Sequence, residues 1–287
     1  MHSTERLKAD SILLFVALVW GTAFIAQRLA AQVLGYFMFN GLRFLLGALF
    51  LLVIMRFRVE LRREDLLLTV LASGALFAGS VFQQAGLRWT TAGNGGFITS
   101  LYVVLVPLVL LVFWKQKVGW RAWLAAGIAG IGALLLSTGG LGLRLAPGDA
   151  IELGGAFFWS FHVILIGLAA QRVHPLPFTF GQLVVAGSVQ LILGLLFEHP
   201  GMGNISASLW TIGYTGIFTI GLAYALQAYG QRHAPPSDAA LLLSLEATFA
   251  GIFGWLILGE RMSPVQIGGC ALIFLAIVIS QLKANRS

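Results

Sequence analysis

Four ionisable side chains interrupt long apolar stretches of this sequence, and they are the first residues that could do chemistry. They are Arg43, Glu152, His162 and Glu246. A charged residue at the centre of a bilayer costs about 2.5–3.5 kcal/mol on insertion scales, so such residues are normally paired, face a water-filled cavity or bind a solute. Each of the four therefore needs a partner, which is either another part of the protein or a solute.

Arg43 and Glu246 each have a functional and a structural interpretation. Arg43 would neutralise the carboxylate of a solute, or it would tie its helix to a carbonyl or acid of another helix. Glu246 has the hydroxyl residues Ser244 and Thr248 close by. It would bind the ammonium group of a solute, carry a coupling proton, or hold two helices together as a hydrogen-bonded acid.

His162 and Glu152 occur in one apolar stretch. His162 follows Trp159 by three residues, so the two side chains are on the same face of a helix. A lone histidine in such a stretch either is a hydrogen-bonded interior residue or contacts the solute. Glu152 is close to the start of the stretch, and it is expected at the membrane interface.

The apolar stretches also carry aromatic rings and amides that could line a pocket. Trp20 and Trp159 occur deep in their stretches, although tryptophan normally collects at the membrane surface. Gly79, one turn before Gln83, would leave space there. The other candidates for this pocket are Phe24, Gln83, Asn94, Tyr102, Tyr224 and Gln227. Such a pocket suits an amphipathic metabolite such as an amino acid; the alternative is that the rings only pack the helices together.

Transmembrane helices must position these residues. Of the 287 residues, 58% are hydrophobic and only 10% are charged, whereas soluble domains carry about 25% charged residues. About 20 apolar residues cross a bilayer, and stretches of about this length account for nearly the whole chain. The stretches are 11–31, 35–55, 65–87, 91–113, 119–138, 149–170, 176–197, 209–230, 237–258 and 263–282. The expected fold is all-α, a polytopic membrane protein with ten transmembrane helices.

The basic residues predict the orientation of these helices. Of the 18 lysines and arginines, thirteen fall on the side of the N-terminus, and Arg28, Arg88, Arg144 and Arg261 fall on the other side. Lysine and arginine concentrate in cytoplasmic loops. The protein is therefore expected to be a multi-pass protein of the cytoplasmic (inner) membrane, with both termini in the cytoplasm.

Two halves of the chain, 1–143 and 147–287, repeat one another. Residues 76–88 align with 220–232, and further matches follow in the same order. The matched pairs include Asp10 with Asp149, Trp20 with Trp159, Gln83 with Gln227, Gly86 with Gly230, Arg88 with Arg232, Ser100 with Ser244, and Tyr102 with Glu246. Each half has five spans, an odd number, so the second half must enter the membrane upside down. Inverted repeats enclose a site near the bilayer midplane and open it alternately to each side.

Glycine and proline mark places where helices bend or approach one another. Pro107 removes a backbone hydrogen bond, and its repeat partner is Gly251, so the two are candidate hinges. The glycine-rich run 92–96 would leave free N–H groups for an anion at the start of a helix. Small residues in 127–132 and 268–270 predict close helix packing or an oligomer face.

Other classes of site are not expected. Cys270 is the only cysteine, which rules out an internal disulfide, and the histidines lack the spacing of metal ligands. There is no GxxxxGK[ST] motif for ATP and no basic stripe with aromatic residues for nucleic acid. We therefore expect no metal and no cofactor, so a gradient or a partner would have to power any transport.

Several motifs in a fixed order cover nearly the whole chain and both halves. They are WGTAF (20–24), FNGLRFLLG (39–47), QQAGLRWTTAG (83–93), ITSLYVVLVP (98–107) and LLSLEATFAGIFGWLILGERMSPVQIGG (242–269). In this order they resemble the EamA-type members of the drug/metabolite transporter superfamily. The chain departs from the family at Ala247 and at Gly35-Tyr36, where relatives often carry proline, and its first half lacks the Gly-Glu-Arg ending of 259–261.

The resemblance implies a secondary transporter that moves small metabolites by alternating access, with amino acids, aromatic ones among them, as exported substrates. An integral-membrane enzyme acting on a lipid-linked or amphipathic substrate is the alternative. It would need acids, histidines or metal ligands gathered at one depth, whereas the acidic residues here are dispersed along the sequence. A receptor or assembly subunit is a third class, which paired inverted halves argue against. The expected partners are the lipid bilayer and a small-molecule substrate.

Overall fold

The computed structural model describes residues 2–117, 119–138, 147–199, 201–261 and 263–281, and the regular structure within these ranges is helical. Within them, eight helices are long and apolar enough to cross a membrane. Five of these are unbroken: α1 (His2–Ala31), α2 (Tyr36–Ile54), α3 (Leu66–Gly86), α7 (Pro147–Ala170) and α8 (Pro175–Phe197). A 3-10 turn, η1 (Arg63–Asp65), leads into α3. The expected all-α fold is confirmed.

The other three long helices are built from consecutive segments. Their segments in chain order are α4 (Ala92–Thr99) and α5 (Tyr102–Trp114), then α10 (Leu209–Tyr214), η2 (Thr215–Leu222) and α11 (Ala223–Gly230), then α12 (Pro236–Leu243) and α13 (Leu245–Leu258). The segment η2 is a π-helix, and π-helical turns are frequent at functional sites. A short helix, α9 (Met202–Ala207), precedes α10.

Two of the segmented helices are broken at serines that the repeat alignment pairs. Ser100 follows α4, and Ser244 separates α12 from α13. The Ser100 hydroxyl donates to the carbonyl oxygen of Phe97 (3.0 Å), and the Ser244 hydroxyl donates to that of Leu241 (2.7 Å). Such bonds to the preceding turn offer the backbone an alternative to the helix and often bend it. The same local chemistry therefore accompanies both breaks.

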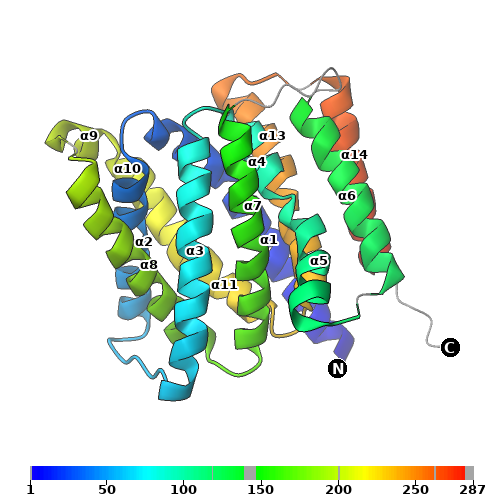
Figure 1. Cartoon of the computed structure of the whole chain (residues 1–287), viewed down its shortest axis with the longest axis horizontal. Coiled ribbons are helices and arrows are strands. Elements are labelled where there is room, and N and C mark those ends of the chain that lie inside the picture. Colours follow the sequence, from blue (N-terminus) through cyan, green and yellow to red (C-terminus); the bar gives the residue numbers. More distant parts are fainter. Residues whose placement is uncertain (1, 118, 139–146, 200, 262, 282–287) are drawn as a thin grey trace.

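Two further helices, α6 (Trp120–Thr138) and α14 (Pro264–Gln281), carry shorter apolar segments. They pack against each other at one end of the bundle (Figure 1). A Cβ added to Gly132 would lie 2.7 Å from the carbonyl oxygen of Gly269, so the backbones approach closely here. This is the close packing that the small residues of these segments predict.

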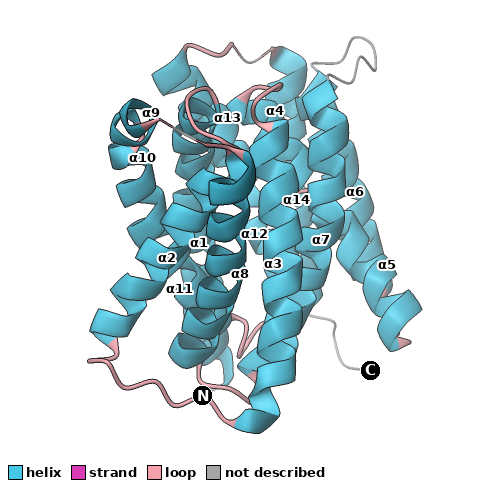
Figure 2. Ribbon diagram, turned by 60° about the vertical axis from the view of Figure 1, so that its left-hand side comes forward, coloured by secondary structure: helices cyan, strands magenta, loops and turns pink. Residues whose placement is uncertain are grey.

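Helices of one half of the chain pack against helices of the other half. The helix α1 packs against α11 and α13, and α7, which has the same place in the second half, packs against α3 and α5. The helices α2 and α8 pack against each other at the end of the bundle opposite α6 and α14 (Figure 1). Figure 2 shows the helices side by side and running in broadly one direction, as they would across a membrane.

Large apolar side chains cover the outside of the bundle. Leu67 and Phe197 are each 70% exposed, and Ile131, Leu195 and Trp255 are more than half exposed. Soluble proteins rarely expose large contiguous apolar surfaces. Together with the eight long apolar helices, this surface identifies a multi-pass membrane protein.

The helix α1 extends beyond its apolar stretch. It begins at His2, whereas the stretch begins at residue 11. Ion pairs one turn apart support the polar extension, with 2.9 Å between Arg6 and Asp10 and 3.0 Å between Lys8 and Glu5. The helix therefore begins nine residues before the apolar stretch, and local charge pairs support this polar extension.

The contact between α6 and α14 gives a prediction about stability. Gly132→Val should lower the thermal stability of the purified protein in detergent, because overpacking a closely packed contact costs about 1–3 kcal/mol. Gly127→Val on the same helix is the matched control, since nothing lies within 4 Å of a Cβ added there. Equal unfolding midpoints for the two variants would contradict the packing described here.

Candidate functional site

A cavity lies in the middle of the bundle, where residues from both halves meet. Its lining consists of Trp20, Ala23, Phe24, Gln27, Arg43, Gln83, Thr99, Tyr102, Trp159, His162, Val163, Thr219, Ile220, Tyr224, Gln227 and Glu246. All of these side chains are buried except Trp20, which is partly buried. The lining includes every candidate pocket residue named from the sequence except Asn94, and it includes Arg43.

One wall of the cavity is aromatic. The Trp20 and Tyr224 rings are 5.0 Å apart, and Trp159 stacks on Tyr224 with 6.5 Å between ring centroids. His162 contacts both Trp159 and Tyr224 edge-on, at 5.5 Å from each. Trp20 is oriented by its indole N–H, which donates to the carbonyl oxygen of Thr219 in η2 (2.9 Å). This wall offers a flat apolar surface to a bound molecule.

The cavity holds two side chains of opposite formal charge that are not paired. Arg43 and Glu246 are 2% and 4% exposed, and neither has an ion-pair partner within 4.0 Å in the described part of the chain. Arg43 donates from Nε to the side-chain oxygen of Asn40 (2.9 Å) and lies over the Phe39 ring. Because Asn40 is on the same helix, this bond does not tie Arg43 to another helix.

Glu246 lies beside Tyr102, its partner in the repeat alignment. The Tyr102 hydroxyl is buried and forms no hydrogen bond of good geometry. Tyr102 and Glu246 follow Ser100 and Ser244, the serines at the helix breaks, by two positions each. The two breaks therefore present one hydroxyl and one carboxylate from equivalent positions to the same cavity.

Several buried polar atoms of the lining have no hydrogen-bond partner among the residues that the structure describes. They are Oε1 and Nε2 of Gln227, the indole nitrogen of Trp159 and Oε1 of Gln27. His162 differs, because its Nε2 is 2.9 Å from the side-chain oxygen of Gln182. Buried polar atoms are nearly always satisfied, so unpaired ones beside a cavity indicate a polar ligand or water. The cavity thus combines polar groups with an aromatic wall, as ligand pockets do.

A chain of hydrogen bonds leads from the cavity to Glu152. Gln83 donates to the Thr99 hydroxyl (3.3 Å), which donates to Oε2 of Glu152 (3.1 Å). The Glu152 side chain is 0% exposed within the protein, and its expected position at the membrane interface stays a prediction. The helix α7 begins at Pro147, and α3 and α4 pack over the carboxylate.

Asn94 lies outside the central cavity. It lines a separate pocket together with Gly93, Gly251 and Glu260. At the start of α4 the backbone N–H groups of Ala92 and Gly93 donate to the Glu260 carboxylate (3.1 and 3.2 Å). The anion at this helix start is therefore part of the protein, and the Gly-Glu-Arg ending of the second half supplies it.

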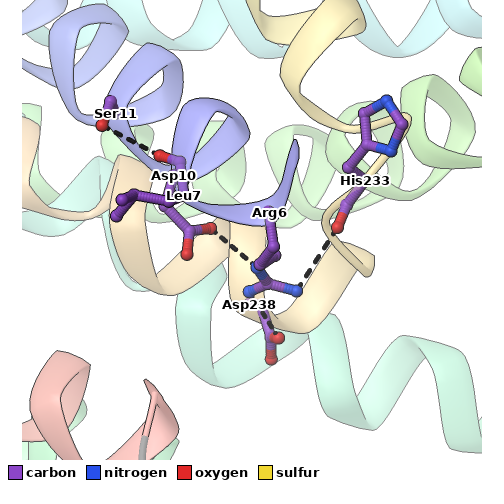
Figure 3. A network of polar contacts seen from close by, with 6 residues as sticks. All are labelled: Arg6, Leu7, Asp10, Ser11, His233 and Asp238. Atoms are coloured by element: carbon purple, nitrogen blue, oxygen red, sulfur yellow. Dashed lines mark hydrogen bonds and ion pairs between the residues drawn. The ribbon is translucent and has the colours of Figure 1, made fainter. Parts of the chain in front are cut away.

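An ion-pair network joins α1 to α12 on the N-terminal side of the bundle. Arg6 lies between Asp10 and Asp238, at 2.9 and 2.8 Å, and its Nη1 donates to the carbonyl oxygen of His233 (3.5 Å) (Figure 3). On the opposite side, Glu260 joins α13 to α4. Polar contacts therefore link the halves on both sides of the cavity.

The candidate hinges lie beyond the helix breaks. Pro107 is inside α5, and Gly251 is inside α13. The hinge role of these two residues stays a prediction. Sequence reasoning missed the breaks at Ser100-Leu101 and Ser244, although the alignment of these two serines was the available signal.

Comparison of the chain with known protein families identifies one family. The model of the EamA-like transporter family matches residues 7–138 and again residues 146–282. An uncharacterized transporter of Archaeoglobus fulgidus is 33% identical, over 98% of this chain and 88% of its own length. The uncharacterized transporter YyaM of Bacillus subtilis is 26% identical, over 96% of this chain and 93% of its own length.

Two further similarities are more distant. The WAT1-related protein At3g02690, chloroplastic, of Arabidopsis thaliana is 24% identical, over 91% of this chain and 66% of its own length. One crystal structure is 19% identical, covers 96% of both chains and superposes with a TM-score of 0.79, which shows the fold alone. The family match covers both halves of the chain and points to transport and away from catalysis. The protein belongs to the EamA-like transporter family.

Proposed function

We propose that the protein is a secondary transporter that exports amino acids, aromatic ones included, across the cytoplasmic membrane. The observation that carries this proposal is that Arg43 and Glu246 line one cavity without an ion-pair partner. The carboxylate of an amino acid would bind Arg43, and its ammonium group would bind Glu246. The aromatic wall of Trp20, Trp159 and Tyr224 would hold the side chain.

Alternating access of two inverted halves would move the solute. In this proposal α6 and α14 also cross the membrane, which makes ten spans. Equivalent hydrogen bonds on opposite sides support the inversion: Gln32 donates to the carbonyl oxygen of Arg88 (3.4 Å), and Gln171 donates to that of Arg232 (2.8 Å). The paired breaks at Ser100 and Ser244 support it as well. Rocking of one half against the other would open each side of the cavity in turn.

The proposed orientation has both termini in the cytoplasm, because the basic residues concentrate on that side. A reporter enzyme fused after the C-terminal residue should be active only where cytoplasmic proteins are active. Activity of the fusion on the outer side would contradict this orientation.

Transport by the purified protein tests the proposed function. Proteoliposomes should exchange labelled L-phenylalanine with unlabelled amino acids supplied one at a time from a panel, and empty liposomes should not. A panel of amines and carboxylic acids without the second charge should compete weakly, because each would leave Arg43 or Glu246 unpaired. Absence of exchange for every amino acid in the panel would overturn the proposal.

A substitution behind the aromatic wall should also reduce transport. A Cβ added to Gly79 would lie 2.9 Å from the Trp159 ring, so the space expected beside Gly79 is filled by that ring. Gly79→Leu should force the ring towards the cavity and lower L-phenylalanine exchange about tenfold. Gly74→Leu is the matched control on α3, since nothing lies within 4 Å of an added Cβ there. Equal exchange by both variants would contradict the packing of Trp159 on α3.

A further inference from the structure

The two halves differ at one buried position next to the cavity. Glu152 on α7 packs against Gly86, where an added Cβ would lie 2.7 Å from the Glu152 Cγ. Leu13 on α1 packs against Gly230, the repeat partner of Gly86, where an added Cβ would lie 2.9 Å from the Leu13 Cγ. Both side chains are 0% exposed. Leucine therefore satisfies the packing in the first half, and packing alone does not explain a glutamate in the second.

The Glu152 carboxylate is buried without a compensating cation. Neither oxygen has a basic side chain within 4.0 Å in the ranges that the structure describes. Oε2 accepts one hydrogen bond from Thr99, and Oε1 is buried with no hydrogen-bond partner. An ionised carboxylate in such a place is costly, whereas a protonated one is not.

The other charged groups that face Glu152 are acidic. Asp149 is one turn earlier on α7, and the carboxylate of Glu246 on α13 adds a second like charge. The helices α3 and α4 contribute the neutral groups of Gln83 and Thr99. Like charges nearby add to the cost of an ionised Glu152, so this environment also favours a bound proton.

Polar groups lie on two sides of Glu152. Towards the cavity, Gln83 donates to Thr99 and Thr99 donates to Glu152, and both Gln83 and Thr99 line the cavity. Towards the end of the bundle at which α7 begins, Asp149 accepts a hydrogen bond from Thr90 (2.6 Å). Asp149 and Thr90 are 3% and 5% exposed and adjoin the exposed loop residue Trp89.

We propose that Glu152 is the proton-coupling site of this transporter. A proton from outside water passes Asp149 to Glu152 and binds on Oε1, and it leaves when the cavity opens to the other side. Binding of the solute to Gln83 perturbs the hydrogen bonds from Gln83 to Thr99 and from Thr99 to Glu152. This change couples binding of the solute to binding of the proton. The claim that this proton is coupled to transport rests on the proposed function. The claim that Glu152 carries a proton does not rest on it.

Infrared spectroscopy of the purified protein tests the proton directly, without any solute. The carbonyl stretch of a protonated carboxylic acid should be present in the wild type and lose one component in Glu152→Gln. The same component should persist in Glu246→Gln. If Glu152→Gln does not fold, Glu152→Leu replaces it, because leucine has the same packing at position 13. An unchanged carbonyl band in the folded Glu152 variant would overturn the proposal.

Gradient-driven transport tests the coupling. With one proton exchanged per solute, a gradient of one pH unit should concentrate L-phenylalanine about tenfold in the acidic compartment of wild-type proteoliposomes. Glu152→Gln should abolish this accumulation and leave exchange without a gradient within about twofold of the wild type. Full accumulation by the variant would overturn the proposal. If the wild type exchanges no amino acid, the proposed function fails, and the infrared result alone decides whether Glu152 binds a proton.

Discussion

Glu246→Gln should lower the exchange of L-phenylalanine about a hundredfold while the protein stays folded. The substitution keeps the shape of the side chain and removes its charge, so an ammonium group would enter the cavity without its partner. Loss of one member of a buried charge pair costs about 2–5 kcal/mol, and 2.7 kcal/mol is about a hundredfold. The measurement is the exchange rate in proteoliposomes at solute concentrations below saturation.

Two comparisons separate loss of charge recognition from general damage. Glu64→Gln makes the same chemical change at an exposed position in η1 and should have no effect. 3-Phenylpropionate lacks the ammonium group and leaves Glu246 unpaired in the wild type, so it should compete for the cavity at least as well in Glu246→Gln as in the wild type. If the variant weakened 3-phenylpropionate and L-phenylalanine by the same factor, Glu246 would have no specific role toward the ammonium group.

Replacing Trp20 and Trp159 together by alanine should weaken L-phenylalanine binding about tenfold or more. Each aromatic contact contributes about 0.5–1.5 kcal/mol beyond the area it buries, and both rings lie against the Tyr224 ring. The effect should be larger for phenylalanine than for alanine as the solute, because alanine has no ring to stack. Competition for exchange by the two amino acids gives both values.

The matched control for this pair uses tryptophans outside the cavity. Trp120 and Trp255 are 68% and 54% exposed on the outer surface of the bundle. Trp120→Ala with Trp255→Ala removes the same number of rings and should leave competition unchanged. Trp20→Phe with Trp159→Phe should restore most of the affinity. Equal losses in the cavity pair and the surface pair would contradict the role of the aromatic wall.

Many of the residues that line the cavity were predictable, because their side chains have a high free-energy cost at other places in a membrane. An arginine, a glutamate or a deep tryptophan needs a reason in an apolar stretch, and Arg43, Glu246 and Trp159 all line the cavity. Thr99, Thr219 and Ala23 also line it, yet such residues are common in any transmembrane helix. Whether these residues line the cavity depends on which face of their helix is turned towards it, and residue type alone does not show this.

The surroundings of single residues were harder to predict than helix content. Asn94 has the right side chain, but it lies in the first turn of α4, beside the end of α13, and so outside the central cavity. Glu152 lies near the start of α7, yet its side chain is 0% exposed. The glycines at 86 and 95 make room for its side chain, and this accommodation depends on three helices at once. Packing that involves several helices is difficult to predict from the order of residues along one of them.

The helix breaks explain how equivalent positions reach the cavity from both sides. Each half carries a serine, Ser100 or Ser244, that bonds back to the preceding turn. The residues two positions later, Tyr102 and Glu246, line the cavity. Discontinuous helices near the membrane midplane present side chains and backbone groups to a solute. In the proposed mechanism the chain uses this device twice, with a hydroxyl in one half and a carboxylate in the other.

Labelling of a single cysteine in the cavity tests the central claim, that one cavity opens in turn to both sides of the membrane. Ala23 is small, 2% exposed and part of the lining, so Ala23→Cys with Cys270→Ser provides the probe. A membrane-impermeant thiol reagent should label it from either side of oriented vesicles, and L-phenylalanine should protect it from both. Labelling from one side only, or labelling that L-phenylalanine does not slow, would contradict the account.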